Sequence, residues 1–105
     1  MSQTASPPRA EDVLAILRAN EAALHVVGIR HLSLFGSVAR GEAGPDSDVD
    51  ILVQLDREAR IDLFQFAVLE EQLSEMLGLP VDLVAEPVEK HRLRARIDRD
   101  RRDAF

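Results

Sequence analysis

Residues 31–55 read HLSLFGSVARGEAGPDSDVDILVQL, and this stretch decides the expected fold. It opens with the apolar run 32–35, passes through Gly36-Ser37 and a polar loop, and closes with the apolar run 51–53. We interpret it as a strand, a tight turn leading into a short helix, and a second strand. The two strands are expected to pair as a hairpin with a long loop.

Two carboxylates, Asp48 and Asp50, stand one residue apart where the second strand is expected to begin. In a strand the residues i and i+2 point to the same face, so we expect these two side chains to lie side by side. Two carboxylates on one face repel each other and require a cation between them. Oxygen ligands with open positions suit Mg²⁺, which keeps waters and takes substrate phosphates as its other ligands.

The turn before these carboxylates supplies the complement. Gly36 allows the backbone to approach a phosphate closely, and Ser37 offers a hydroxyl and an N–H at the start of a helix. Helix N-termini bind anions through their free N–H groups and the helix dipole. A phosphate cradle together with paired carboxylates predicts a site for a metal-bound nucleoside triphosphate.

The string GSVARG, followed after a gap by DSDVDILV, resembles the nucleotidyltransferase motif of the DNA polymerase beta superfamily, and most of all its minimal nucleotidyltransferases. Asp82, within Val81–Val84, fits the position of that family's third carboxylate. The resemblance covers residues 30–84 and implies a nucleotidyltransferase fold. It also implies that Asp48 and Asp50 hold Mg²⁺, and that Asp82 shares a second ion and acts as base on the attacking hydroxyl.

The resemblance further implies a biological role. Free-standing members of this size are often antitoxins that pair with a HEPN-domain ribonuclease toxin and attach AMP from ATP to one of its tyrosines. The expected function is therefore Mg²⁺-dependent AMP transfer to a partner's hydroxyl within a hetero-oligomer. The alternative is a non-catalytic module that masks its partner by contact alone. A drug- or metabolite-modifying transferase is disfavoured, because 105 residues leave no second domain for a small acceptor.

The carboxylates also have structural interpretations. A turn at Pro45–Asp48 would account for Asp48. It would not account for Asp50, whose charge interrupts an apolar strand and is costly there unless it is paired. Asp82 could instead face solvent at the edge of a sheet.

The phosphate-binding candidates have structural interpretations as well. Ser37 could be an ordinary helix N-cap. Arg40, about one helical turn further on, could hold a triphosphate oxygen with its guanidinium or could simply be solvated. Ser47 is a further candidate for nucleotide binding. His31 is expected to have no functional role.

Composition is that of an ordinary globular domain, with 105 residues, 46% hydrophobic and 30% charged. Without cysteine, neither a disulfide framework nor a thiolate metal site is possible. No apolar run approaches the ~20 residues of a membrane span, and the polar residues 1–9 do not resemble a signal peptide. We expect a cytoplasmic protein. The net charge of −6 argues against direct nucleic-acid binding.

We expect residues 1–9 to be frayed and residues 10–105 to form a single domain. Apolar spacing predicts one helix over residues 10–27 and another over residues 61–77. A third strand is expected over residues 80–84, followed by a last helix that ends at about residue 99. Pro7 or Pro8 is expected in the first turn of the first helix, and Val13, Ile16, Leu17, Leu24 and Val27 on its buried face. The alternation predicts an α/β (α+β) fold in which helices flank a small mixed sheet.

Two segments carry more than the fold requires. Helix 61–77 has more apolar residues than one buried face needs, which predicts either a thick core contact or a docking surface. Residues 89–103 hold seven Lys/Arg and four Asp/Glu on an otherwise acidic chain. This basic segment is either a solvated helix face or a contact for a partner or RNA.

Overall fold

The computed structural model describes residues 7–105. Its helices are α1 (Ala10–Ala19), α2 (Glu21–Val26), α3 (Gly36–Arg40), α4 (Leu63–Leu77) and α5 (His91–Asp100), with a 3-10 turn, η1, at Arg57–Ala59. Its strands are β1 (Ile29–Phe35), β2 (Val49–Leu55), β3 (Val81–Ala85) and β4 (Arg102–Asp103). Within the described residues, no helix has the length and apolar character needed to cross a membrane.

The four strands form one mixed sheet in the order β3-β2-β1-β4. β1 is antiparallel to β2 and β4, whereas β2 is parallel to β3. The α/β fold with a small mixed sheet and the β1–β2 hairpin are therefore confirmed. The sequence analysis does not predict β4, because two residues are too few to show an alternating pattern.

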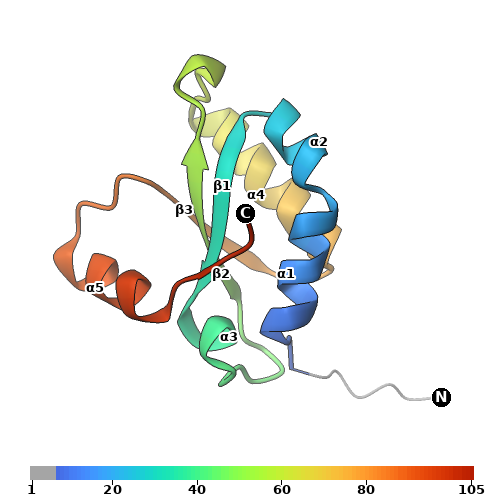
Figure 1. Ribbon diagram of the computed structural model, residues 1–105, viewed down its shortest axis with the longest axis vertical. Coiled ribbons are helices and arrows are strands. Elements are labelled where there is room, and N and C mark those ends of the chain that lie inside the picture. Colours follow the sequence, from blue (N-terminus) through green and yellow to red (C-terminus); the bar gives the residue numbers. More distant parts are fainter. Residues whose placement is uncertain (1–6) are drawn as a thin grey trace.

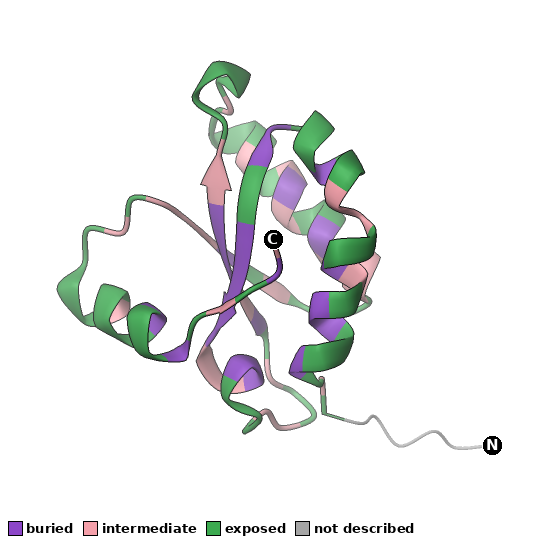
Figure 2. Cartoon of the chain, in the orientation of Figure 1, coloured by how far each residue is buried: buried purple, intermediate pink, exposed green. Residues whose placement is uncertain are grey.

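Alternation along the strands gives the sheet two different faces. The first face packs against α1, α2 and α4 and forms the main core, which includes Leu17, Leu32, Leu34, Ile51 and Leu73. The second face carries a smaller cluster, Phe35, Leu52 and Ile97, beneath α5. Figure 1 shows α1, α2 and α4 on one side of the sheet and α5 on the other, and Figure 2 shows the buried positions where the strands meet α1 and α4.

The single helix predicted over residues 10–27 is wrong, because the chain breaks at Asn20 into α1 and α2. The Asn20 side chain donates to the carbonyl of Ile16 at 2.8 Å. Asparagine side chains that bond to nearby backbone compete with helix continuation. Val27 lies beyond α2 and is exposed, so it does not belong to the buried face predicted for it.

The other boundaries lie close to the predicted ones. β1 begins at Ile29, two residues earlier than predicted. α4 begins at Leu63, because Asp62 forms a capping box with Gln65. Of the predicted frayed segment, residues 1–6 lie outside the described residues. Pro7–Arg9 precede α1, so the two prolines lie outside its first turn.

The apolar surplus of α4 is used in the core only in part. Its middle packs into the core, while Leu63 and Phe64 at its start are 89% and 77% exposed. Phe64 lines a shallow groove with Val27, Ile61 and Val68. This apolar surface lies at the end of the sheet opposite α3 (Figure 1).

A hydrogen bond from a buried serine attaches β4 to the sheet. Ser33 on β1 is 1% exposed and donates its hydroxyl to the Asp103 carboxylate at 2.6 Å. This bond, and then the bond from Arg101, holds the pKa of Asp103 below its ordinary value. Because the pKa is lower in the folded state, the contact stabilises the fold above the unfolded-state pKa. The stabilisation is lost as pH falls through the folded-state pKa.

We expect Ser33→Ala to lower stability at pH 7 by about 1 kcal/mol, the usual net value of such a bond. The difference from wild type should narrow as Asp103 becomes protonated in acid. Ser74→Ala is the matched control, because the Ser74 hydroxyl donates to the carbonyl of Leu79, also at 2.6 Å, and that acceptor does not titrate. The measurement is the melting temperature of both variants from pH 7 to pH 3. An equal, pH-independent loss of stability in both variants would contradict the assignment of a titrating Ser33–Asp103 bond.

Candidate active site

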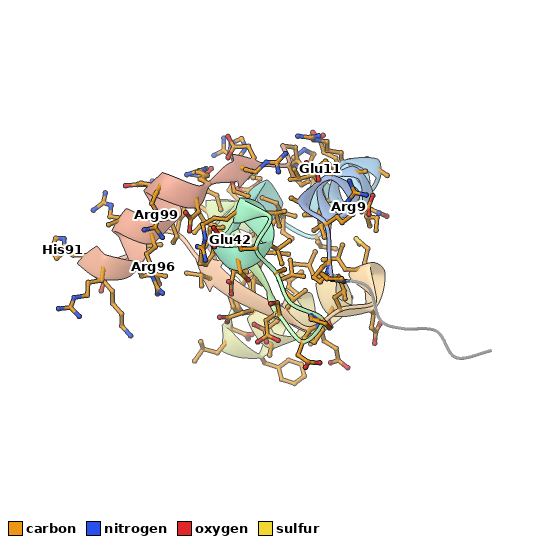
Figure 3. All side chains as sticks on the ribbon, turned by 90° about the horizontal axis from the view of Figure 1, so that it is seen from below. Arg9, Glu11, Glu42, His91, Arg96 and Arg99 are labelled. Carbon is orange, nitrogen blue, oxygen red and sulfur yellow. The ribbon has the colours of Figure 1, made fainter. Side chains whose placement is uncertain are left out.

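A cleft of about 490 Å³ opens on the second face of the sheet, between α3 and α5. α3 and α5 each contribute one wall and the strands contribute the floor. The lining consists of Gly36, Ser37 and Arg40 from α3, of Leu93, Arg96 and Asp100 from α5, and of Phe35, Asp50, Asp82 and Val84 from the strands. Figure 3 views this region from below, with Arg96 and Arg99 on α5 and Glu42 just after α3.

Asp50 and Asp82 lie beside each other on the floor. They are direct partners in the parallel register of β2 and β3, and alternation places both on the second face. Neighbouring strands run about 4.8 Å apart, so the two carboxylates are held close by the backbone itself. Asp82 is exposed to the cleft, whereas Asp50 is partly buried. The sequence predicts the residues of this pair, but the structure adds the register that joins them.

The surroundings of Asp50 disfavour its negative charge. Burial is the largest cause that raises the pKa of Asp50, followed by the carboxylates of Asp82 and Asp48. Arg96 and Arg40 act in the opposite direction but do not outweigh these effects. The floor therefore carries more negative charge than its neighbours neutralise, which makes it an attractive position for a cation.

Asp48 and Ser47 lie outside the cleft lining. β2 begins at Val49, so Asp48 belongs to the preceding loop, and strand alternation does not fix it beside Asp50. Its charge nonetheless acts on Asp50. The Ser47 hydroxyl accepts a hydrogen bond from the Gly44 N–H at 2.8 Å, which stabilises the loop.

The chemistry of these donors fits a magnesium site that is not fully assembled. Among residues 7–105, no three carboxylate, histidine or cysteine side chains are gathered so as to hold a metal ion. Asp50 and Asp82 are adjacent, whereas the Asp48 side chain has to turn toward them to share an ion. Three carboxylates with unbalanced charge match the oxygen ligands that Mg²⁺ prefers.

Gly36 is required by its contact with the floor. Its backbone has φ 76°, and a Cβ at this position would collide with the Asp50 carboxylate. Gly36 thus brings the start of α3 directly against the acidic pair. Ser37 is the second residue of α3, whose N-cap is Phe35, so the N-cap interpretation of Ser37 is wrong.

Arg40 lines the cleft, but its guanidinium is engaged. It donates to Asp100 at 2.7 Å and to Glu42 at 3.1 Å. Asp100 is buried at the end of α5 and also accepts from Arg99 at 2.9 Å. Bonds from Arg99 first, and then from Arg40, hold the pKa of Asp100 below its ordinary value.

Sequence reasoning misses the α5 wall of the cleft. Leu93, Arg96 and Asp100 come from the segment interpreted as a basic surface, yet all three line the cleft. Their spacing of i, i+3 and i+7 places them on one helical face, and this is the signal that could have identified them. His31 lies exposed on β1, outside the cleft lining.

Comparison with known proteins places this arrangement in context. The model of the nucleotidyltransferase domain family matches residues 16–104. The protein adenylyltransferase MntA of Thermococcus cleftensis is 49% identical over 75 residues, which cover 70% of this chain and 74% of MntA.

Two solved structures share the fold. One, described as a minimal nucleotidyltransferase, is 35% identical, with a TM-score of 0.71 over 90% of this chain and 94% of its own. The other, a toxin–antitoxin structure with AMP-PNP, is 23% identical, with a TM-score of 0.66 over 90% of this chain and 71% of its own. At that identity the second likeness establishes the fold alone.

We expect Asp50→Asn to raise the melting temperature of the metal-free protein at pH 7. The raised pKa means that ionised Asp50 destabilises the fold, and this penalty appears as pH rises from the unfolded-state pKa through the folded-state pKa. The gain should vanish in acid, where Asp50 is protonated in both states. Asp46→Asn, an exposed position in the loop, is the control and should show no such gain. A less stable Asp50→Asn at pH 7 would contradict the excess of negative charge on the floor.

Proposed function

This chain belongs to the nucleotidyltransferase domain family, and from that premise we propose that it transfers AMP from ATP to a hydroxyl of a partner protein. One observation carries the proposal most directly. Asp50 and Asp82 lie in register on the floor of a cleft, and Gly36 and Ser37 line the same cleft. A carboxylate pair facing a close backbone turn suits a metal-bound triphosphate.

Asp48, Asp50 and Asp82 would hold Mg²⁺ in this proposal. When bound, Mg²⁺ supplies charge neutralisation of the triphosphate and activation of the acceptor hydroxyl. Gly36 and Ser37 would hold phosphates against the start of α3. Arg40 and Ser47 stay predictions as nucleotide contacts, since Arg40 would have to leave Asp100 or use a remaining N–H, and Ser47 would have to leave Gly44.

The proposed reaction is an in-line displacement at the α-phosphorus. The acceptor oxygen forms a bond to that phosphorus, the bond to the bridging oxygen of the β-phosphate breaks, and pyrophosphate leaves with the electron pair. Asp82 is the residue we assign to take the hydroxyl proton, because it is exposed at the cleft and lies next to Asp50. A positioned base of this kind contributes about 10²–10⁴-fold to a rate.

A protein acceptor agrees with the shape of the site. The cleft walls that the structure describes are two short helices, and the cleft is open between them. The name of the Thermococcus cleftensis relative, a protein adenylyltransferase, supports a protein as the acceptor. We propose a tyrosine of a HEPN-domain toxin as that acceptor, with this chain acting as the antitoxin in a hetero-oligomer.

We expect Asp82→Asn to retain most of the affinity for Mg-ATP and to lose AMP transfer by about 10²–10⁴-fold. Asp48 and Asp50 still hold one ion in this variant, while the acceptor hydroxyl loses its base. The measurement is the mass of the proposed HEPN-domain partner after incubation with the wild type or the variant and Mg-ATP.

Wild type should add one or more AMP units to the partner and suppress its ribonuclease activity. Asp82→Asn should form the complex and leave the partner unmodified and active. If Asp82→Asn suppresses the ribonuclease as completely as wild type, with no AMP on either protein, then masking by contact is the better explanation and the enzyme proposal fails.

Gly36→Ala and Gly41→Ala separate the geometry of the cradle from backbone strain. Both glycines have φ near 75°, so alanine should cost each variant about 1–2 kcal/mol of stability. Only at Gly36 does the new Cβ meet Asp50, because at Gly41 it meets nothing within 4 Å. We therefore expect Gly36→Ala to melt below Gly41→Ala because of this collision, and to be the one variant of the two that loses Mg-ATP binding. Unchanged affinity in Gly36→Ala would remove the turn from the site.

A further inference from the structure

We propose that Arg96 is a phosphate-binding residue of this site, and that the Arg40–Asp100 ion pair positions α5 so that Arg96 faces the acidic floor. The inference rests on the proposed function. It adds a cationic residue from α5, which lies outside the motif in residues 31–55. Its ligand is the triphosphate chain, whatever nucleoside that chain carries.

Arg96 occupies the right place in the cleft. It lines the same cavity as Asp50 and Asp82, from the opposite wall, and it extends from the α5 face that also carries Leu93 and Asp100. Figure 3 shows Arg96 on α5, one turn before Arg99.

Unlike Arg40 and Arg99, Arg96 has no carboxylate partner within the described residues. Arg40 and Arg99 both bind Asp100, at 2.7 and 2.9 Å. Within residues 7–105, Arg96 forms no ion pair, although Asp50, Asp82 and Asp100 line the same cleft. A guanidinium that remains uncommitted beside an acidic floor is available to an anion that arrives with its own metal. Its planar set of donors matches two phosphate oxygens at once.

The charges require such a residue. A triphosphate carries about four negative charges and would sit over carboxylates that already repel one another. The floor carboxylates Asp50 and Asp82 would hold an Mg²⁺ ion that neutralises part of this charge from one side. A fixed cation on the opposite wall neutralises the outer oxygens, and Arg96 is the wall residue whose side chain is free to do so.

The Arg40–Asp100 pair explains how α5 is held in place. The Asp100 side chain is 2% exposed and joins the last residue of α5 to the last residue of α3. Ile97, one turn before the end of the helix, packs with Phe35 and Leu52 on the second face of the sheet. These two contacts fix the C-terminal half of α5, in which Arg96 lies. Arg40 is therefore a positioning residue in this inference.

The test compares Arg96→Ala and Arg96→Lys with Arg92→Ala. Arg92 is the matched control, because it is exposed on the same helix one turn earlier, makes no ion pair within the described residues and lies outside the cleft lining. Titrations use Mg-ATP and magnesium tripolyphosphate. We expect Arg96→Ala to lower the affinity for both ligands by about ten- to hundred-fold. Arg96→Lys should lower the affinity less, and Arg92→Ala should bind both ligands like wild type. Melting temperatures without ligand should be unchanged in all three.

Each of the other possible results would overturn either the Arg96 assignment, the choice of the phosphates as its ligand, or the proposed function. If wild type binds Mg-ATP and Arg96→Ala binds both ligands as tightly as wild type does, the Arg96 assignment fails and the proposed function stands. If Arg96→Ala weakens ATP but not tripolyphosphate, its contact is with the nucleoside and the phosphate assignment fails. If wild type binds neither ligand, the proposed function fails and this inference fails with it.

Arg40→Ala tests the positioning role separately. We expect a lower melting temperature together with weaker binding of both ligands, because buried Asp100 loses one of its two partners and α5 loosens. Weaker binding at an unchanged melting temperature would mean that Arg40 contacts the nucleotide directly, and the positioning role would be wrong.

Discussion

The parallel register of β2 with β3 is the constraint on which the candidate site depends. It sets Asp50 directly beside Asp82, two residues that lie 32 positions apart in the chain. A parallel pair needs a crossover connection of a dozen or more residues, and α4 provides most of it. The capping box at Asp62 starts α4, and Leu69 and Leu73 seat it on the first face of the sheet. The acidic pair on the second face is thus positioned by packing on the first.

Holding two carboxylates together lowers the stability of the fold, and the surrounding structure keeps the pair together despite this cost. Burial and mutual repulsion disfavour the ionised form of Asp50, whose carboxylate lies so close to Gly36 that a Cβ there would collide with it. Charges and backbone conformations that destabilise a fold persist where function requires them. In the proposed function, the same repulsion that weakens the metal-free protein would give the site its attraction for a metal-bound triphosphate.

The extent to which the sequence predicts this molecule follows from the range of each interaction. The hairpin and the third strand are predictable, because apolar runs and turn residues determine them locally. Gly36, Asp50 and Asp82 are candidate residues chiefly through the motif that this chain shares with the family. The break at Asn20 is not, because one side chain overrides a continuous apolar pattern. The α5 wall escapes for a different reason: Arg40 and Asp100 lie 60 residues apart, and only the folded chain brings them together.

Calorimetric titration of ATP into this protein, with Mg²⁺ and then with a chelator in its place, tests most directly whether the acidic pair and the α3 turn form one site. The repulsion on the cleft floor also acts on the phosphates of free ATP. We therefore expect binding in the presence of Mg²⁺ and little or none without it. Equal affinity under the two conditions would show that the carboxylates take no part in nucleotide binding. It would contradict a single site formed by the acidic pair and the α3 turn.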